Sequence, residues 1–324
     1  WHDARTLRFA GADSTTEGQD ASVRLVGRGA WQFDALAYVQ SRNFTNVVVS
    51  STRFVPTLDQ RNTPATGIGG KIEVRPPVGD DSVLRLGMDY RRASGTLYED
   101  AISTATGAVT ERRTAGGTND DLGLFAELDR SIGRLVLTGG VRADRFTIRD
   151  GFYRAATAAG AAITDERYPD SAGWETSVRG GAAFDAGGAL RLRAAGYTGL
   201  RLPTLNELYR PFVVFPVTTQ ANAALRNERL EGFEAGIDYA PSPAIEVSLT
   251  AFDNRVRDAI ANVTIGPNLR QRQNIDAIRA RGIEASAGVG IGTVRLDGSL
   301  AWTDAKARGT GAAAALDGLR PAQT

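Results

Sequence analysis

Hydrophobic and polar residues alternate along most of this chain. In the segment SVLRLGMDY, Leu84, Leu86 and Met88 fall on one face of an extended chain, and Arg85 and Asp89 fall on the other. Successive side chains of a β-strand point to opposite faces, so a period of two predicts strands with one apolar and one polar face. The same pattern recurs over residues 20–28, 30–42, 121–129, 134–146, 173–184, 189–199, 228–239, 244–252, 280–288 and 293–302. The chain is therefore expected to be all-β.

The connections between these segments alternate in length. Short turns are predicted at 76–81, 130–134, 185–189, 240–244 and 288–292. Long polar stretches lie between them, at 43–66, 93–119, 148–172, 201–227 and 257–279. Loops longer than about 12–15 residues are uncommon in compact domains. An antiparallel up-and-down sheet would place all the short turns at one end and all the long loops at the other, which is the asymmetry of a transmembrane β-barrel.

The residue types on the two faces also favour a membrane wall. One face is aliphatic, whereas the other mixes arginine, aspartate, glutamate, serine and glycine. Of the 38 basic residues only Lys71 and Lys306 are lysine, although lysine is a common residue on water-facing sheets. The arginine excess has two explanations, a GC-rich genome or ordered networks in which arginine binds carboxylates with two hydrogen bonds. An aliphatic face against lipid and a polar face along a lumen fit a barrel.

Aromatic residues near the strand ends predict an interfacial girdle, with ordinary core packing as the alternative. They are Trp31, Tyr90, Trp174, Tyr239 and Trp302. Mean hydropathy is −0.22, and no apolar run of about 18 residues exists, which excludes a transmembrane helix.

The pattern gives roughly 13 strands, whereas single-chain bacterial barrels have even numbers. The chain also starts at Trp1 without a methionine. We therefore expect an incomplete segment of a longer barrel, because an open sheet in lipid would leave two unpaired edges. A soluble β-sandwich or adhesin fragment is the alternative outside the membrane class.

Candidate chemistry is sparse. His2 is the only histidine and cysteine is absent, so a Ser-His-Asp triad, a thiolate metal site and a disulfide scaffold are excluded. Net charge is +1, which gives no electrostatic case for nucleic acid. The acid pairs at 80–81 and 120–121 are expected at strand edges, as solvated turns or, as the alternative, Ca²⁺ ligands. No catalytic residue, metal site or cofactor is predicted.

The stretch LRLPTLNELYRPF, residues 200–212, ends one predicted strand. Pro203 lacks an N–H and would terminate that strand. Thr204 would cap a helical turn, with Glu207 three residues later as the reciprocal acid and as a partner for Arg201. Pro211 would then stop the turn. This predicts either a folded loop base or a surface that contacts substrate.

Together with its surroundings, this stretch resembles the TonB-dependent outer-membrane receptors. The signature residues are Tyr197, Arg201, Pro203, Thr204, Leu205, Glu207, Leu208 and Tyr209. Downstream, Asn222, Leu225, Glu228, Glu234 and Gly236 match the family's next strand, although Ala223 and Asn227 replace its two prolines. Asn274, Gly282 and Glu284 match the following hairpin. The resemblance is specific over about residues 190–324 and is one of pattern upstream.

The resemblance implies a barrel of 22 strands with a plugged lumen, of which residues 1–324 would be a partial barrel domain without the plug and the C-terminal strands. It implies a bacterial outer-membrane location and active transport, with the TonB energy-coupling protein acting through the absent plug. The implied ligand is a ferric siderophore, with a corrinoid or a carbohydrate as alternatives. Outer-membrane lipid and lipopolysaccharide are further expected partners. A passive porin or another outer-membrane β-barrel is the alternative function.

If the chain belongs to such a receptor, the substrate contacts would fall on the extracellular loop at Tyr209, Arg210, Phe212 and Phe215. The arginines of segments 226–232 and 270–274, with Arg201 and Arg210, would attract an anionic ligand or lipopolysaccharide headgroups. The signature residues themselves are expected to be architectural.

Overall fold

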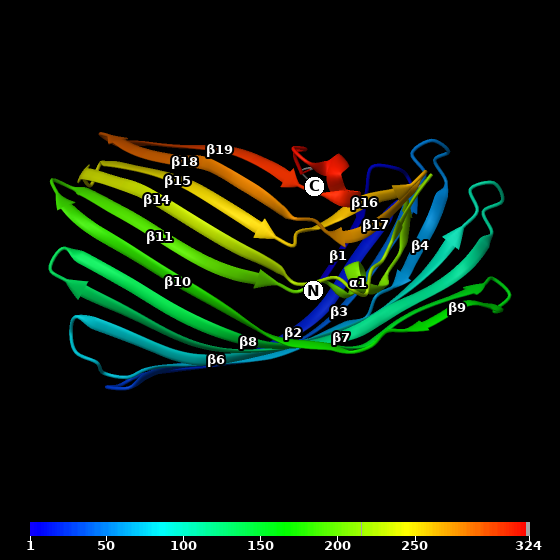
Figure 1. The fold of residues 1–324 in the computed structure, drawn as a ribbon, viewed down its shortest axis with the longest axis horizontal. Coiled ribbons are helices and arrows are strands. Elements are labelled where there is room, and N and C mark those ends of the chain that lie inside the picture. Colours follow the sequence, from blue (N-terminus) through cyan, green and yellow to red (C-terminus); the bar gives the residue numbers. More distant parts are fainter. Residues whose placement is uncertain (215, 322–324) are drawn as a thin grey trace.

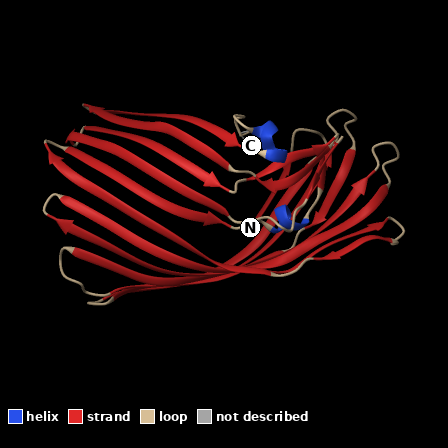
Figure 2. Ribbon diagram, viewed as in Figure 1, coloured by secondary structure: helices blue, strands red, loops and turns tan. Residues whose placement is uncertain are grey.

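The computed structural model describes residues 1–214 and 216–321, and these form almost only β-strands (Figures 1 and 2). The long strands are β2 (Asp13–Arg28), β3 (Gln32–Val49), β5 (Ala65–Arg75), β6 (Ser82–Ile102), β7 (Val109–Ile132), β8 (Leu135–Thr157), β10 (Ser171–Gly187), β11 (Leu190–Arg201), β14 (Glu228–Ser242), β15 (Ile245–Arg257), β18 (Ala277–Ile291) and β19 (Val294–Arg308). The shorter strands are β1 (His2–Thr6), β4 (Pro56–Asn62), β9 (Ala162–Arg167), β12 (Phe212–Val214), β13 (Val217–Gln220), β16 (Ile260–Gly266) and β17 (Leu269–Asn274). Two short helices are α1 (Leu205–Tyr209) and the 3₁₀ helix η1 (Gly311–Leu316).

One antiparallel sheet contains most of these strands. Within the described residues its path is β1-β2-β3-β4-β6-β7-β8-β10-β11-β14-β15-β18-β19, with β5 and β9 beside it. The thirteen strands of this path agree with the number that the alternation predicts, and the up-and-down order is confirmed. The sheet curves into a trough whose first and last strands are not paired with each other (Figure 1).

The short turns gather at the left end of Figure 1 and the long connections at the right end, as predicted. Only two residues separate β7 from β8, and two separate β14 from β15. Four of the five predicted loops are wrong in detail, because 43–66, 93–119, 148–172 and 257–279 are mostly strand. β6 and β7 stay paired as far as Ile102 and Val109, and β8 continues against β9. These extensions lack the apolar outer residues of the lower strands, so alternation could not reveal them.

β4 and β5 together make one wall strand. Both pair with β3 and β6, and they are separated only by Thr63 and Pro64. Pro64 cannot donate a ladder hydrogen bond, but its carbonyl still accepts one from the Thr96 N–H at 3.1 Å. The proline therefore interrupts the strand without displacing it.

The outer face is aliphatic and exposed. Ile237 and Leu249, which are register partners on β14 and β15, are 43% and 39% exposed. The concave face instead carries arginines paired with acids; Arg142, for example, donates to both oxygens of Asp89 and reaches Asp144 at 2.6 Å. The prediction of one aliphatic face and one polar face is confirmed, and arginine–carboxylate pairs line the concave face.

Two connections at the loop end fold back over the concave face. The segment between β11 and β14 contains α1, β12 and β13, and the segment between β15 and β18 contains β16 and β17. Their strands form a separate sheet in the order β12-β13-β17-β16. One buried cluster joins α1 to β8, and a second joins β16 to η1. Among the described residues, no helix is long and apolar enough to cross a membrane.

Candidate functional site

The helix α1 begins as the sequence predicts. Thr204 is its N-cap: the Thr204 hydroxyl accepts from the Glu207 N–H at 3.2 Å, and the Glu207 carboxylate accepts from the Thr204 N–H at 2.8 Å. This reciprocal pair satisfies two backbone donors that a helix start leaves free. The helix ends at Tyr209, with Arg210 as its C-cap before Pro211.

Arg201 connects this helix to the next strand. Its guanidinium donates to both oxygens of Glu207, at 2.9 and 3.0 Å, and also binds Glu228. Glu228 in turn accepts from the Ile260 N–H at 2.6 Å. Burial by itself would raise the pKa of Glu207, but Arg201 and the hydrogen bonds from Thr204 hold it below its ordinary value. The carboxylate is therefore ionised at neutral pH and holds the start of α1 to the end of β11.

The apolar side of α1 lies on the concave face of β7 and β8. Leu208 and Tyr209 are each 3% exposed and pack with Phe146 and Ile148 of β8. On β8 the concave face is charged at Arg142 and Asp144, and changes to Phe146 and Ile148 where α1 covers it. The change in residue type therefore marks the place where the loop folds inward.

Two glycines leave space for Tyr209. A Cβ on Gly151 would lie 2.3 Å from the Tyr209 Cζ, and one on Gly117 would lie 3.3 Å from the Tyr209 Cε2. The Tyr209 ring stacks on Tyr168 with centroids 4.9 Å apart. Burial raises the pKa of both phenols, and the hydrogen bond to Glu166 raises that of Tyr168 further. Both rings are therefore neutral packing elements at physiological pH.

Arg210 points to a buried acid on a distant strand. It donates to Glu99 of β6 at 2.6 Å, and Glu99 is only 1% exposed. Arg113 lies 3.8 Å from the same carboxylate, and Gln60 accepts weakly from Arg210 at 3.5 Å. A buried carboxylate needs such partners, because an unpaired charge in this setting is costly.

Arg272 of β17 closes the other end of α1. It donates to the carbonyls of Asn206 and Arg210, both at 2.7 Å, and its guanidinium lies 5.0 Å from the Phe212 ring centroid. Burial lowers the pKa of Arg272. Asn222 donates to the Arg272 carbonyl at 2.9 Å, and β13 pairs in parallel with β17. We call α1, β12, β13, β16 and β17 the inner unit, because these contacts join the two connections.

Signature residues outside the inner unit hold the wall together. The Tyr197 ring lies over Gly232, and its hydroxyl donates to Asn254 at 3.1 Å. In the same way Phe252 covers Gly282, where an added Cβ would lie 2.1 Å from the Trp302 carbonyl oxygen. Aromatic rings over cross-strand glycines fix the register of neighbouring strands.

Glu284 is exposed on the concave face, where strand register places it beside Thr250 and in line with Arg193.

The structure places the predicted substrate contacts in different environments. Tyr209 and Arg210 are engaged with protein groups, Phe212 is partly buried beneath Arg272, and Phe215 lies outside the described residues.

Four of the arginines that were expected to attract an anion are also paired: Arg201 with Glu207, Arg210 with Glu99, Arg226 with Asp258 and Arg229 with Glu175. Arg272, from the same expectation, donates to backbone carbonyls instead. Reasoning from sequence missed Glu99 and Gly151, because both lie far along the chain from the residues of α1 that they contact.

The acid pair at 120–121 lies inside β7, not at a strand edge. Asp120 accepts from Arg149 at 2.6 Å, and Asp121 pairs with Arg91 at 3.0 Å. The described residues contain no group of three or more His, Cys, Asp or Glu side chains arranged to hold a metal ion.

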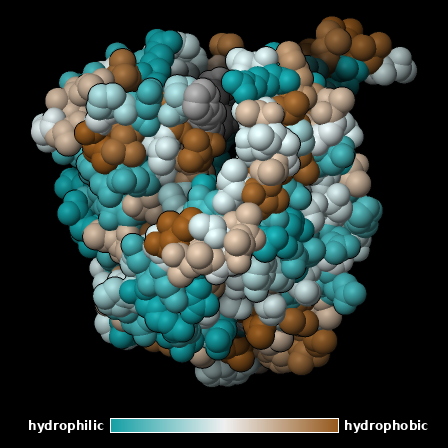
Figure 3. All heavy atoms as spheres, turned by 90° about the vertical axis from the view of Figure 1, so that its right-hand side faces the viewer, coloured by the Kyte–Doolittle hydropathy of each residue, from teal (hydrophilic) through white to brown (hydrophobic). Residues whose placement is uncertain are grey.

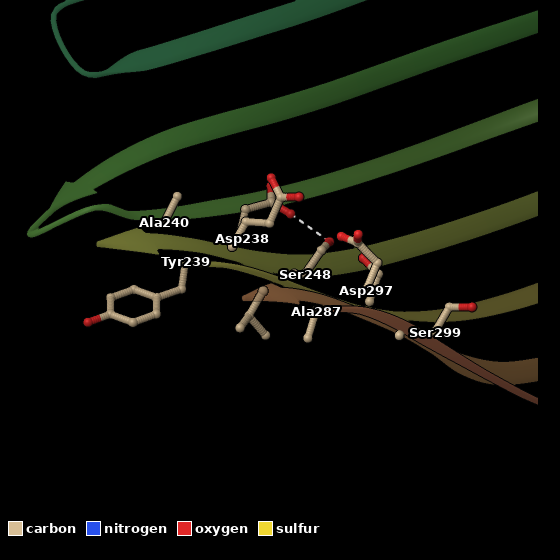
Figure 4. Close-up of a pocket in the computed structure, with 12 residues that line it drawn as sticks. Asp238, Tyr239, Ala240, Ser248, Ala287, Asp297 and Ser299 are labelled. Carbon is tan, nitrogen blue, oxygen red and sulfur yellow. Dashed lines mark hydrogen bonds between the residues drawn. The ribbon is translucent and has the colours of Figure 1, made fainter. Parts of the chain in front are cut away.

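At the turn end, β14, β15, β18 and β19 line a hollow of about 620 Å³. Asp238, Ser248 and Asp297 point to one side of the sheet, whereas Tyr239 and Ala287 point to the other (Figure 4). Ser248 donates to Asp238 at 2.7 Å. The loop end, seen face-on in Figure 3, also presents mainly hydrophilic residues with apolar ones scattered between them.

Comparison with known proteins agrees with the antiparallel barrel-like sheet described above. The sequence matches the family model "TonB dependent receptor-like, beta-barrel" over residues 2–324. The chain therefore belongs to the TonB-dependent receptor family and corresponds to the β-barrel of these proteins. Comparison with curated proteins finds no match.

Several solved structures share the fold. The copper transporter OprC has a TM-score of 0.71 and 18% identity, with 92% of this chain and 48% of OprC covered. The ferric yersiniabactin uptake receptor FyuA from Yersinia pestis has a TM-score of 0.67 and 14% identity, with 91% of this chain and 43% of FyuA covered. The FrpB iron transporter from Neisseria meningitidis (F3-3 variant) has a TM-score of 0.65 and 17% identity, with 91% of this chain and 44% of FrpB covered. This chain thus spans less than half the length of these three proteins.

Proposed function

We propose that residues 1–324 are part of the barrel of an active-transport receptor in the bacterial outer membrane. The full-length protein would capture a scarce nutrient at its loop end and import it with energy from the TonB system, without chemical conversion. The observation that carries this proposal is the family match over nearly the whole chain. The aliphatic outer face and the charged concave face support a membrane wall around a polar lumen.

The proposed barrel has 22 strands, and a plug domain and the C-terminal strands would belong to the full-length protein. The TonB energy-coupling protein would act through that plug. The 43–48% coverage of OprC, FyuA and FrpB supports a larger protein. Outer-membrane lipid and lipopolysaccharide would surround the aliphatic face.

A ferric siderophore is the proposed substrate, and a corrinoid or a carbohydrate is the alternative. FyuA is titled a ferric yersiniabactin uptake receptor and FrpB an iron transporter, which supports a metal chelate. We propose that Phe212 and Phe215 contact the ligand, and the position of Phe212 on β12, against the Arg272 guanidinium, supports this for Phe212. Tyr209 and Arg210, predicted beside them, would position that base through Tyr168 and Glu99.

The test is growth on scarce nutrients. A strain that lacks the receptor gene is complemented with the full-length gene and supplied with ferric siderophores, a corrinoid or oligosaccharides as the limiting source. We expect rescue by at least one ferric chelate, and rescue should disappear when TonB is deleted. Uptake that persists without TonB, together with ohmic conductance in planar bilayers, would establish a passive porin instead.

A further inference from the structure

Two acids face each other across β4 and β6, and β4 lies at the loop end of the wall (Figure 1). Asp59 of β4 and Asp100 of β6 are direct register partners. Gln60 and Glu99, the adjacent pair, point to the concave side, toward α1, so Asp59 and Asp100 lie on the outer face. The run of apolar outward residues on β6 ends at Tyr90. Asp100 is ten residues further on, which is roughly 33 Å of extended chain, so the pair lies well beyond the aliphatic zone.

The two carboxylates share one bound cation. Asp100 is 8% exposed, and its Oδ2 lies 3.1 Å from the Arg61 Nε. Within the described residues the other oxygen of Asp100, Oδ1, is buried and has no hydrogen-bond partner. Asp59 is partly buried and, over residues 1–214 and 216–321, makes no salt bridge and no side-chain hydrogen bond. A buried acceptor without a donor costs stability, so this end of the sheet is one donor short.

Few other charged groups face this pair. Arg112 of β7 is the second register partner of Asp100, but it is exposed and joins no salt bridge in the part of the chain that the structure describes. Tyr98 precedes Asp100 on the same face of β6, and β3 contributes no charged side chain to the row. Like charges directly opposite each other destabilise a sheet. Burial and the neighbouring Asp100 raise the pKa of Asp59 above its ordinary value, although Arg61 opposes this.

The strand that carries Asp59 is held by short ladders. β4 has four register pairs with β3 and four with β6, and each ladder contains a register shift. β5, which continues the same wall strand beyond Pro64, has eleven pairs with β3 and ten with β6. A repulsive pair within β4 therefore affects a much larger share of the pairing than it would in β5.

We propose that Asp59 and Asp100 form a proton-operated clasp between β4 and β6. At neutral pH the two ionised carboxylates repel each other, and β4 is loosely held. In acid, Asp59 takes one proton from solvent, and the new O–H donates to the unpartnered Oδ1 of Asp100. The proton removes the like-charge pair and supplies the missing donor, so β4 tightens. The clasp rests on the proposed outer-membrane orientation only in facing the outside of the cell, where pH follows the surroundings.

The direction of the pH response follows from linkage. Because the folded-state pKa of Asp59 is raised, the folded protein binds more protons than the unfolded chain below neutral pH. The stability of β4 pairing should therefore increase as pH falls from 7 toward about 4, where the unfolded carboxyl is also protonated. Glu207, whose pKa is lowered, should respond to acid in the opposite direction within the same receptor.

The test is amide hydrogen exchange of residues 57–62 in the purified full-length receptor, with the intrinsic exchange rate at each pH divided out. The parent should exchange more slowly at pH 5 than at pH 7 by about fivefold, the size expected of one like-charge cross-strand pair. Asp59→Asn, which places a neutral donor at the same position, should show the slow rate at both pH values. Arg61→Gln removes the cation that favours ionised Asp59 and should move the transition to higher pH.

Asp165→Asn is the matched control. Asp165 is an exposed acid of β9 that binds Arg154 at 2.9 Å, and β6, β7 and β8 separate it from β4, so the variant should respond to pH as the parent does. Equal exchange of the parent at the two pH values, or a persistent pH response in Asp59→Asn, would overturn the proposal. Slow exchange at pH 7 that depends on Ca²⁺ and is lost with EDTA would also overturn it, because a metal ion would then link the carboxylates. Exchange in detergent reports on the clasp whether or not the receptor imports a chelate, so a failure of transport would contradict only the proposed function.

Discussion

Arg201 donates two hydrogen bonds to Glu207, at 2.9 and 3.0 Å, and so joins the last residue of β11 to the helix that follows it. The same guanidinium binds Glu228 at the start of β14. One arginine therefore closes the connection of 26 residues between two neighbouring wall strands.

Replacement of Glu207 should loosen this connection before it affects the ligand. Glu207→Ala removes one of the two acids bound to Arg201 and the acceptor for the Thr204 N–H, and we expect a cost of about 2 kcal/mol in local stability. Trypsin should then cut within 202–227 in folded, membrane-inserted receptor. Glu207→Gln keeps an acceptor for the cap and should show an intermediate rate of cutting. Normal assembly with a loss of ligand affinity alone would show that Glu207 acts on the ligand.

The same carboxylate makes the connection sensitive to acid. The folded-state pKa of Glu207 lies below its ordinary value, so its stabilising contribution is present above the unfolded pKa and is lost as pH falls through the folded pKa. Protection of 202–227 should be constant from pH 7 to about 5 and should decline below about 4. The Glu207→Gln receptor should lack this dependence, as measured by amide hydrogen exchange of 202–227 with the intrinsic exchange rate at each pH divided out.

Gly151 should tolerate no side chain while Tyr209 is present. A Cβ there would lie 2.3 Å from the Tyr209 ring, so Gly151→Ala must displace α1 at a cost of about 2 kcal/mol. In a double-mutant cycle, Tyr209→Leu should relieve much of the cost of Gly151→Ala. Thermal unfolding of the purified receptor provides the stabilities of the parent, the two single variants and the double variant. Additive effects of the two substitutions would contradict the packing described above.

Arg210 should be required for the stability of the fold because Glu99 is buried. Arg210→Met leaves a carboxylate that is 1% exposed with only Arg113 nearby, at 3.8 Å, and we expect about 3 kcal/mol of destabilisation. The Glu99→Gln/Arg210→Met pair should be less destabilised than Arg210→Met alone, since the buried charge is gone. If Arg210 instead serves only the ligand, Arg210→Met will unfold at the parent temperature and lose binding.

Gly282 and Gly298 form a matched pair on adjacent strands. A Cβ on Gly282 would lie 2.1 Å from the Trp302 carbonyl oxygen, whereas one on Gly298 would meet nothing within 4 Å. Gly282→Ala should therefore lower the fraction of assembled barrel, and Gly298→Ala should not. Heat-modifiable mobility of the outer-membrane fraction measures both, and equal behaviour of the two variants would show that Gly282 has no steric role.

Some contacts of the inner unit were predictable from the sequence and others were not. Thr204, Glu207 and Arg201 lie within six residues of one another, so the cap and the ion pair were predictable from local spacing and are confirmed. The Arg210–Glu99 pair joins residues 111 positions apart, and no local pattern indicates such a partner. The substrate contacts at Phe212 and Phe215 stay a prediction.

The sequence by itself determined the strands, their two faces, the separation of turns from long connections and the TonB-dependent receptor family. These follow from a period of two and from local motifs, which depend only on neighbouring residues. Only the tertiary structure decided that four predicted loops contain paired strands, that α1 lies on β7 and β8, and that Arg210 meets Glu99. Those relationships depend on strand register and on long-range packing, because residues far apart in the chain become neighbours only when the sheet forms.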